Sequence, residues 1–575
     1  MTTESEDKKM AQVAVDVAME STSQEILELL KVVKTMVTDV SKFDWKNFWE
    51  QTATDEVFST KFYYYDTSTS PSGEKMNASV GLTAVPSTET VKGQDDFANH
   101  SAFQTIDCNF VIDEQENKTP VAIKGGNGYS DIGKVDVGVM VPLTYWGIQK
   151  FDTYYIVHFA TKPHPELECT TVTPWCNKEL GYGILTKYYA GQIDGILYSS
   201  SGNAIYNFAS AQSGNTELQK KGTGYHGSGS ERTAYLLCML WTKYATKNSQ
   251  KVFKGCTEYN LQYKVTQADE NANYVTLTTT QANNFYVGGT VSIGDATGHT
   301  DKLDRGQAYM RNIADKVRVT AIVAVDGTSN SRVYVDKSGM TITEDTYISS
   351  MPLHSGTTDN VLGVDGYVKN DGKHAFKLGG IEDMVGTYYI SMNELWNKTT
   401  ASTAEYYIRG KSVWSSTASD WEKVVTADFT TSEDCWIGDI DMDLKSGVTW
   451  LKTKGSGDSV GTGDRQYTGS TGTGWREALR NGNLWRWSYA GLSYVNLRND
   501  VTNANWNYAL CDYRFDEIKI VRWYFVWHFA DAIPLLRKQH LNRHQKGNWG
   551  VDGHSGSPCV RHGLGLVEIR TSLGI

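Results

Sequence analysis

The residues with the clearest capacity for chemistry are large aromatic and arginine side chains gathered between residues 475 and 515. Tryptophan, tyrosine and arginine dominate binding hot spots, because each offers a large contact area and directional polar groups at a modest entropic cost. Here they alternate with asparagine and glycine, which hold irregular loops in place. The pattern predicts a non-covalent binding surface, and the plainer alternative is an aromatic-rich β-domain surface with no binding role. The expected contact residues are Trp485, Arg486, Trp487, Ser488, Tyr489, Tyr494, Arg498, Asp500, Tyr508, Leu510, Asp512 and Tyr513.

One glycine motif resembles the dinucleotide-binding fingerprint G-x-G-x-x-G, at Gly222, Gly224 and Gly227. No buried strand precedes it, and no βαβ unit with a suitably placed acid follows it. Ser228 and Glu231 form a capping box instead, which predicts the start of a helix over residues 231–246. We therefore interpret the motif as a helix start.

Two serine motifs resemble nucleophile sites. Residues 457–461 fit the G-x-S-x-G pattern, but they lie in a Gly/Ser/Thr stretch without the strand and helix that a nucleophile elbow needs. Residues 553–558 resemble a protease turn without the supporting histidine and aspartate. We expect both to be loops, and we expect no catalytic residue.

Metal and cofactor sites are not predicted either. Asp439, Asp441 and Asp443 alternate along an expected strand, which places three carboxylates on one face. A bound cation is one interpretation, and a solvated strand edge that discourages pairing is the other. The histidines of the main body have no metal-ligand spacing, so we expect no metal and no cofactor.

Bulk composition narrows the function classes. The 575 residues predict three or four domains, and the net charge of −11 argues against nucleic acid as the main partner. No run of 18 uncharged apolar residues occurs, so no membrane insertion is expected. The acidic N-terminus is unlike a signal peptide, and the eight scattered cysteines suggest reduced thiols and synthesis in a cytoplasm.

Two further segments are expected to position the binding surface or to bring several copies of it together. Apolar residues recur with helical spacing over residues 23–41, which predicts a helix in an N-terminal segment 1–42. A helix this short is marginal alone, so we expect it to pack on the body or on copies of itself, with a trimer favoured. Residues 264–350 alternate Val, Thr and Ile between glycine and aspartate turns, which predicts a small inserted all-β domain.

Three motifs carry a resemblance to a known family. Residues 376–390 contain Gly380, Asp383, Met384 and Gly386, and they resemble the signature G-L-x-D-M-x-G-N-V-W-E-W of the formylglycine-generating-enzyme branch of the C-type lectin fold. Residues 480–485, with Asn481 and Gly482, resemble its R-G-G-S-W turn. Residues 502–508 resemble the S-N-S-N-x-G-F-R ending of its variable subfamily. Departures from these patterns are Thr387 for asparagine, Tyr389 for tryptophan and Asn507 for glycine.

Together these motifs resemble a variable protein of a diversity-generating retroelement, of the kind that phages of gut bacteria carry. The resemblance implies an α+β fold with a C-type-lectin-like scaffold that displays a diversified face to a bacterial surface receptor, either a protein or a glycan. It also implies a place at the tail tip or tail fibre of a virion, next to other tail proteins, after synthesis in the bacterial cytoplasm. The expected scaffold signature is Gly380, Asp383, Met384, Gly386, Asn481 and Gly482.

The residue patterns, together with the span of the resemblance over about 108–515, predict a division into domains. After the N-terminal segment 1–42, a β-rich adaptor would cover 43–107, and the lectin-like domain would cover 108–263 and 351–515 around the inserted domain 264–350. Residues 516–575 would form a C-terminal extension. Two alternatives stay open: a fixed structural tail protein, or an oxidase on the same scaffold. The oxidase is disfavoured because the region of its catalytic cysteine pair contains only Cys511.

Overall fold

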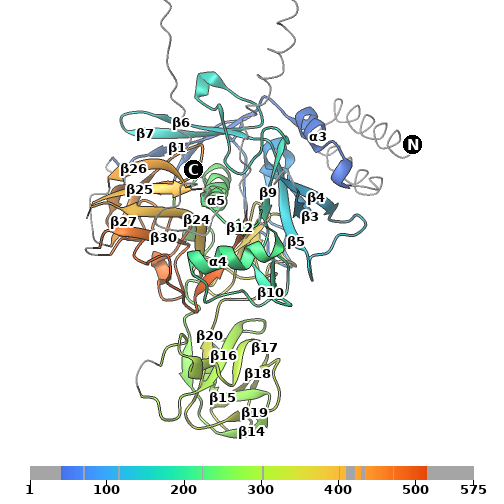
Figure 1. Ribbon diagram of the computed structural model, residues 1–575, viewed down its shortest axis with the longest axis vertical. Helices are drawn as coiled ribbons and strands as arrows, with labels where there is room; N and C mark the ends of the chain where they lie inside the picture. Colours follow the sequence, from blue (N-terminus) through green and yellow to red (C-terminus); the bar gives the residue numbers. More distant parts are fainter. Residues whose placement is uncertain are drawn as a thin grey trace, which may run out of the picture. The chain divides into compact units, whose positions relative to one another are not determined.

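The computed structural model describes residues 40–513, apart from 66, 69–70, 114–116, 223, 301–302, 401, 409–420, 429–433 and 470–471. Strands dominate these ranges (Figure 1). The expected α+β class is therefore wrong, and the fold is β-rich. Short runs rich in Thr, Val, Ile and Tyr form many of these strands, and such residues suit a pleated, half-buried surface. The N-terminal helix expected within residues 1–42 and the extension 516–575 lie almost wholly outside the described residues.

The described residues contain four α-helices and eight 3-10 helices. The α-helices are α3 (Trp45–Thr52), α4 (Ala211–Leu218), α5 (Ser230–Tyr244) and α6 (Thr279–Ala282). The 3-10 helices are η1 (Val40–Lys42), η2 (Asp96–Asn99), η3 (Ser101–Phe103), η4 (Pro165–Leu167), η5 (Gln219–Lys221), η6 (Ser249–Lys251), η7 (Ala308–Arg311) and η8 (Trp487–Tyr489).

Helix α5 contributes eight residues to one of the two large apolar cores, and every residue from Ser230 to Lys243 is buried. A helix that is covered on all sides belongs inside a protein, and its charged residues then need partners. The helix expected over residues 231–246 is confirmed, but the expected capping box is wrong. Gly229 is the N-cap residue without a side-chain cap, and the Ser228 hydroxyl donates to the Gly229 carbonyl.

Two sheets contain most of the strands that precede α5. A five-stranded sheet has the order β2-β1-β7-β6-β8, and a four-stranded sheet has the order β4-β3-β5-β9. The bounds are β1 (Val57–Tyr63), β2 (Glu74–Asn77), β3 (Ile106–Ile112), β4 (Lys118–Ile123), β5 (Asp136–Pro142), β6 (Tyr145–Lys150), β7 (Tyr154–Ala160), β8 (Thr171–Val172) and β9 (Tyr182–Thr186).

Residues 262–350 form sheets of their own, which Figure 1 shows as a group. Six strands are ordered β13-β20-β16-β17-β18-β15, and β14 pairs with β19. The bounds are β13 (Gln262–Lys264), β14 (Asp269–Ala272), β15 (Tyr274–Thr278), β16 (Thr290–Asp295), β17 (Ala314–Ala324), β18 (Asn330–Val335), β19 (Met340–Ile342) and β20 (Thr346–Ser350). The boundaries proposed for the inserted domain and its neighbours stay predictions.

A nine-stranded sheet positions the loops of the expected binding surface. Its order is β26-β25-β24-β30-β31-β29-β27-β28, and β32 pairs with β24 in parallel. The bounds are β24 (Tyr388–Lys398), β25 (Thr403–Ile408), β26 (Glu422–Asp428), β27 (Cys435–Met442), β28 (Thr449–Gly455), β29 (Arg465–Tyr467), β30 (Gly474–Arg480), β31 (Val495–Asn496) and β32 (Tyr508–Leu510).

Three small sheets complete the described fold. The strands β21, β22 and β23 pair in that order, β10 pairs with β11, and β12 pairs with β33. The bounds are β10 (Gly191–Ile193), β11 (Ile196–Tyr198), β12 (His226–Gly227), β21 (Gly366–Tyr367), β22 (Phe376–Leu378), β23 (Ile381–Asp383) and β33 (Asp512–Tyr513). The last pairing joins the segment before α5 to the end of the described chain.

The acidic run at residues 439–443 has a structural role. The run pairs with β28, while the pairing of β27 with β29 covers only Cys435 and Trp436, and the interpretation as a solvated edge is wrong for Asp439 because this residue is buried. Asp439 is buried against Lys247, with 2.7 Å between carboxylate and ammonium. Asp441 pairs with Lys150 at 2.6 Å, and Asp443 accepts from the Ser446 hydroxyl. Each carboxylate has its own protein partner, so the three do not converge on one cation.

Candidate functional site

Asp383 and Asn481 of the expected scaffold signature meet in a buried cluster behind the loop at 481–490, whereas Gly380 lies apart and donates its N–H to the Val364 carbonyl. Asp383, at the end of β23, accepts a hydrogen bond from the Asn481 side chain at 2.7 Å and pairs with Arg232 of α5 at 3.3 Å. The Asn481 amide also donates to the Tyr189 hydroxyl at 3.2 Å. Burial raises the pKa of Asp383, whereas Arg232 and Asn481 favour its charged form. The cluster joins four chain segments at one point.

Positive backbone φ angles shape the loop entrance. Asn481 and Gly482 have φ angles of 69° and 70°, in the left-handed region that asparagine and glycine tolerate. A Cβ atom on Gly482 would lie 2.5 Å from the Cβ of Ala490, so no other residue fits there without a shift. Gly386 donates its N–H to the Asn481 carbonyl at 3.0 Å, and the nearby Met384 is fully buried.

Backbone hydrogen bonds hold the loop that follows. The Asn483 side chain accepts from the N–H of Trp485 at 3.2 Å, and its carbonyl accepts from the N–H of Arg486 at 2.9 Å. The Gln250 side chain donates to the carbonyls of Ser488, at 2.8 Å, and of Ala490. The loop is therefore fixed at both ends.

Two tryptophans on this loop are exposed. Trp485 and Trp487 have 39% and 59% of their surface accessible, and Trp485 packs edge-on against the buried Trp506. Trp487 has a φ angle of +46°, although a bulky residue is disfavoured in this region by roughly 1–2 kcal/mol. Burial does not explain why a tryptophan occupies a strained and exposed position.

Arginine and aromatic side chains stack beside these tryptophans. The guanidinium of Arg465 lies 4.9 Å from the ring centre of Tyr489, which packs edge-on against Trp436. The guanidinium of Arg486 lies 4.0 Å from the ring centre of Tyr467. Among the described residues, neither arginine has a hydrogen-bond partner at Nε. The aromatic–arginine surface is defined as Trp436, Arg465, Trp485, Arg486, Trp487 and Tyr489.

Three residues expected at the contact surface are buried instead: Tyr494, Tyr508 and Leu510. The Tyr494 hydroxyl lies 2.9 Å from that of Tyr388, while Tyr508 and Leu510 belong to β32, which pairs with the buried part of β24. Their physical role is packing, because all three side chains belong to the same apolar core. They support the loop and do not reach its surface.

The other expected contacts have mixed positions. Ser488 is half-buried, and Arg498 is exposed with its guanidinium 3.6 Å from Asp434. Asp500 is exposed and accepts from the Thr502 hydroxyl at 2.9 Å. For Asp512 and Tyr513 the structure gives only the backbone pairing of β33 with β12.

A buried carboxyl group lies directly beneath the loop and was not predicted. Asp464 accepts from the N–H of Ser493 at 2.8 Å, and a Cβ atom on Gly491 would lie 2.0 Å from its Oδ1. Among the described residues, Oδ1 has no hydrogen-bond partner. Burial raises the pKa of Asp464 to about 8, so the group is largely neutral near pH 7. The arrangement is that of a packed support under the loop.

Trp436, Arg465 and Gln250 were also missed by the sequence reasoning. Trp436 lies just before the acidic run, and Arg465 follows the Gly/Ser/Thr stretch, where nothing marks a binding role. The only available signal was their type, since arginine and tryptophan are the residues most enriched in hot spots. Their proximity to Tyr489 is a result of strand order in the large sheet.

Metal ligands, membrane-spanning helices and similar proteins give no functional assignment. Among the described residues, no three His, Cys, Asp or Glu side chains are grouped to hold a metal ion. In the same part of the chain, no helix has the length and apolar character needed to cross a membrane. No protein-family model matches the sequence, and no curated protein matches it significantly.

Proposed function

We propose that this protein is a phage receptor-binding protein that uses the aromatic–arginine surface to recognise a receptor on a bacterial cell. The observation that carries the proposal is Trp487, which is strained and 59% exposed on a loop held firmly at both ends. Strain that the surrounding structure maintains is concentrated at functional sites. A rigid loop with exposed tryptophans also loses little entropy on binding.

The composition of the surface suggests what the receptor offers. The half-buried Arg465 and Arg486 are held by ring stacking, so their guanidinium groups are preorganised for an acidic group. The exposed faces of Trp485 and Trp487 suit a sugar ring or an apolar peptide. We therefore propose a receptor that combines an acidic group with a flat apolar face, bound without catalysis.

Diversification by a retroelement is part of the proposal. In the structure, Asn481, Gly482 and Asp383 are buried and the Asn481 side chain donates to Asp383, whereas Trp485 and Trp487 protrude. This separation lets exposed side chains change without disturbing the frame, which is what a diversified receptor-binding face requires.

We also propose self-association through residues 23–41, with a trimer favoured, because avidity would multiply a weak single-site affinity.

Sequencing the gene from many clonal descendants of one phage population tests diversification. Substitutions are expected at the exposed positions 485 and 487 and at the half-buried positions 486 and 489, with Asn481 and Gly482 unchanged. Substitutions spread evenly along the chain, or an invariant loop, would contradict diversification. If the loop is invariant and the protein still binds cells, the conclusion is a receptor-binding protein whose surface is not diversified.

Replacing Trp487 with asparagine tests the surface itself. Asparagine tolerates the left-handed region, so the free energy of unfolding is expected to stay within about 1 kcal/mol of the wild-type value or to rise. Binding of the labelled protein to host cells is expected to weaken by roughly 30-fold or more, as for a hot-spot residue. Cell binding can be measured by flow cytometry and stability by urea unfolding.

Phe151→Asn provides the control, because Phe151 is another exposed aromatic residue, on the turn between β6 and β7. This variant is expected to bind cells as the wild type does. Equal binding by Trp487→Asn and the wild type would show that the loop is not the contact surface.

A further inference from the structure

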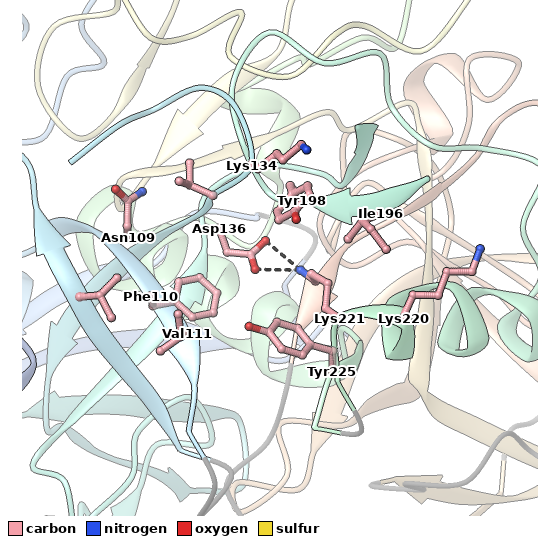
Figure 2. Close-up of a pocket in the computed structure, with 12 residues that line it drawn as sticks. Asn109, Phe110, Val111, Lys134, Asp136, Ile196, Tyr198, Lys220, Lys221 and Tyr225 are labelled. Carbon is pink, nitrogen blue, oxygen red and sulfur yellow. Dashed lines mark hydrogen bonds and ion pairs between the residues drawn. The ribbon is translucent and has the colours of Figure 1, made fainter. Parts of the chain in front are cut away.

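A cleft of about 420 Å³ lies apart from the aromatic–arginine surface and shares no residue with it. Its size is within the range of small-molecule sites, about 300–1,000 Å³. It lies where β3, β4 and β5 meet β11 and η5 (Figure 2). The lining residues are Asn109, Phe110, Val111, Val121, Lys134, Val135, Asp136, Ile196, Tyr198, Lys220, Lys221 and Tyr225.

A buried ion pair lies at the centre of the cleft. The Lys221 ammonium donates to both oxygens of Asp136, at 2.9 and 2.8 Å, and Figure 2 shows these two side chains pointing toward each other. Only 6% and 4% of the two side chains are exposed. Asp136 also accepts from the N–H of Ser199 at 2.9 Å. The polar floor is therefore fixed before any ligand arrives.

Aromatic rings flank this pair. The Lys221 ammonium lies 4.3 Å from the ring centre of Tyr225 and 5.5 Å from that of Tyr198. Both tyrosines are only partly buried, and Val111 contributes an exposed apolar side chain at 42%. The walls can therefore pack against the C–H face of a small ring, while the floor offers polar groups to its substituents.

Two further lysines are placed at the rim. Lys134 pairs with Asp194 at 2.9 Å and Lys220 with Glu217 at 2.6 Å, and the lysine side chains are 59% and 44% exposed. Exposed ion pairs of this kind contribute little to the stability of the fold, so an incoming anion can replace the carboxylate partner at a small cost in free energy. The lining thus contains three ammonium groups and one carboxylate, and the partners Asp194 and Glu217 balance the two rim lysines. A ligand that displaces these two carboxylates meets two free ammonium groups at the rim, which favours an anionic ligand.

We propose that the cleft binds an acidic monosaccharide unit, a pyranose ring that carries a carboxylate, such as the uronic acid of an acidic polysaccharide. The ring packs against the partly exposed faces of Tyr198 and Tyr225 beside Lys221, its hydroxyls bond to the Asp136–Lys221 pair, and its carboxylate contacts Lys134 or Lys220. A neutral sugar would leave the rim lysines unused, and an aromatic acid would leave the polar floor unused. The inference does not depend on the proposed function of the aromatic–arginine surface.

Titration calorimetry of the full chain with glucuronate, glucose and benzoate tests the ligand class. Glucuronate is expected to bind roughly tenfold or more tightly than either of the others, because only glucuronate uses both rim and floor. Its affinity is expected to fall as salt is raised, since the rim charges are exposed. Equal binding of glucose, tighter binding of benzoate, or no binding of glucuronate at its highest soluble concentration would overturn the proposal.

Variants locate the site. The double variant Lys134→Gln/Lys220→Gln is expected to weaken glucuronate binding roughly tenfold without changing the melting temperature, because both side chains are exposed. Tyr198→Ala is expected to weaken it as well. Lys264→Gln is the matched control, since Lys264 is an exposed lysine of β13 paired with Asp345 at 2.8 Å. Unchanged binding in the double variant, or an equal loss in the control, would place the site elsewhere.

Discussion

Replacing Asp383 with alanine is expected to lower the free energy of unfolding by about 3–5 kcal/mol. The variant leaves the charge of Arg232 in the interior without its carboxylate partner, and Arg232 is 1% exposed. It also removes the acceptor of the Asn481 side chain, which then has one partner fewer in a buried site. Urea unfolding followed by circular dichroism measures the loss.

Two further variants define the origin of this effect. Asp345→Ala removes a carboxylate from an exposed pair with Lys264 and is expected to change the free energy of unfolding by less than about 1 kcal/mol. The double variant Arg232→Met/Asp383→Leu removes both charges and is expected to recover part of the loss. A loss below about 1 kcal/mol for Asp383→Ala would show that the cluster does not hold the loop frame.

Replacing Asp464 with asparagine is expected to change how stability depends on pH. Burial raises the folded-state pKa of Asp464 from 3.8 to about 8, so between these values the folded chain holds a proton that the unfolded chain releases. Wild-type stability from this group is therefore complete below about pH 4 and lost as the pH rises to about 8. The asparagine variant lacks this loss.

As the pH rises from 4 to 8, the unfolding free energy of Asp464→Asn minus that of the wild type is thus expected to increase. Its change is on the order of 5 kcal/mol at most, because each pKa unit corresponds to about 1.4 kcal/mol. Using the difference cancels the other buried acids, such as Glu382, whose pKa burial raises to about 7. Urea unfolding at four or five pH values supplies the measurement.

Asp96→Asn gives a contrast of opposite sign. Hydrogen bonds from the Thr83 N–H and the Gln94 side chain lower the pKa of Asp96, so its contribution is present at neutral pH and lost in acid. Its difference curve should therefore change only below about pH 4. A flat difference curve for Asp464→Asn between pH 4 and pH 8 would show that Asp464 is ionised in the folded protein.

The sequence predicted part of the candidate surface and missed the rest for a physical reason. Trp485 and Trp487 lie in an Asn/Gly frame that no long strand interrupts, and both are exposed. Tyr494, Tyr508 and Leu510 have similar sequence surroundings, but they are buried near or within β31 and β32. These strands have two and three residues, too few for an alternating pattern to show which face is covered.

The fold was harder to predict than the local elements. Helix α5 is long enough for its apolar spacing to be visible, and it was found close to its expected bounds. Its start differs because the Gly229 backbone takes the N-cap position. Asp439 shows the opposite case: its partner Lys247 lies 192 residues away, and no local pattern reports a contact at that separation.

The strand pairing of β24 has a consequence for synthesis on the ribosome. This strand pairs with β30 on one side and, at its start, with β32, whose last residue is Leu510. At about 5–20 residues per second, the chain from Lys398 to Leu510 takes roughly 5–25 s to synthesise. β25 follows directly and pairs with the end of β24, but the groups of β24 that face β30 and β32 await their partners during that time, and an unpaired strand edge invites aggregation. The nascent chain is thus expected to need a holding chaperone until its C-terminal third has emerged.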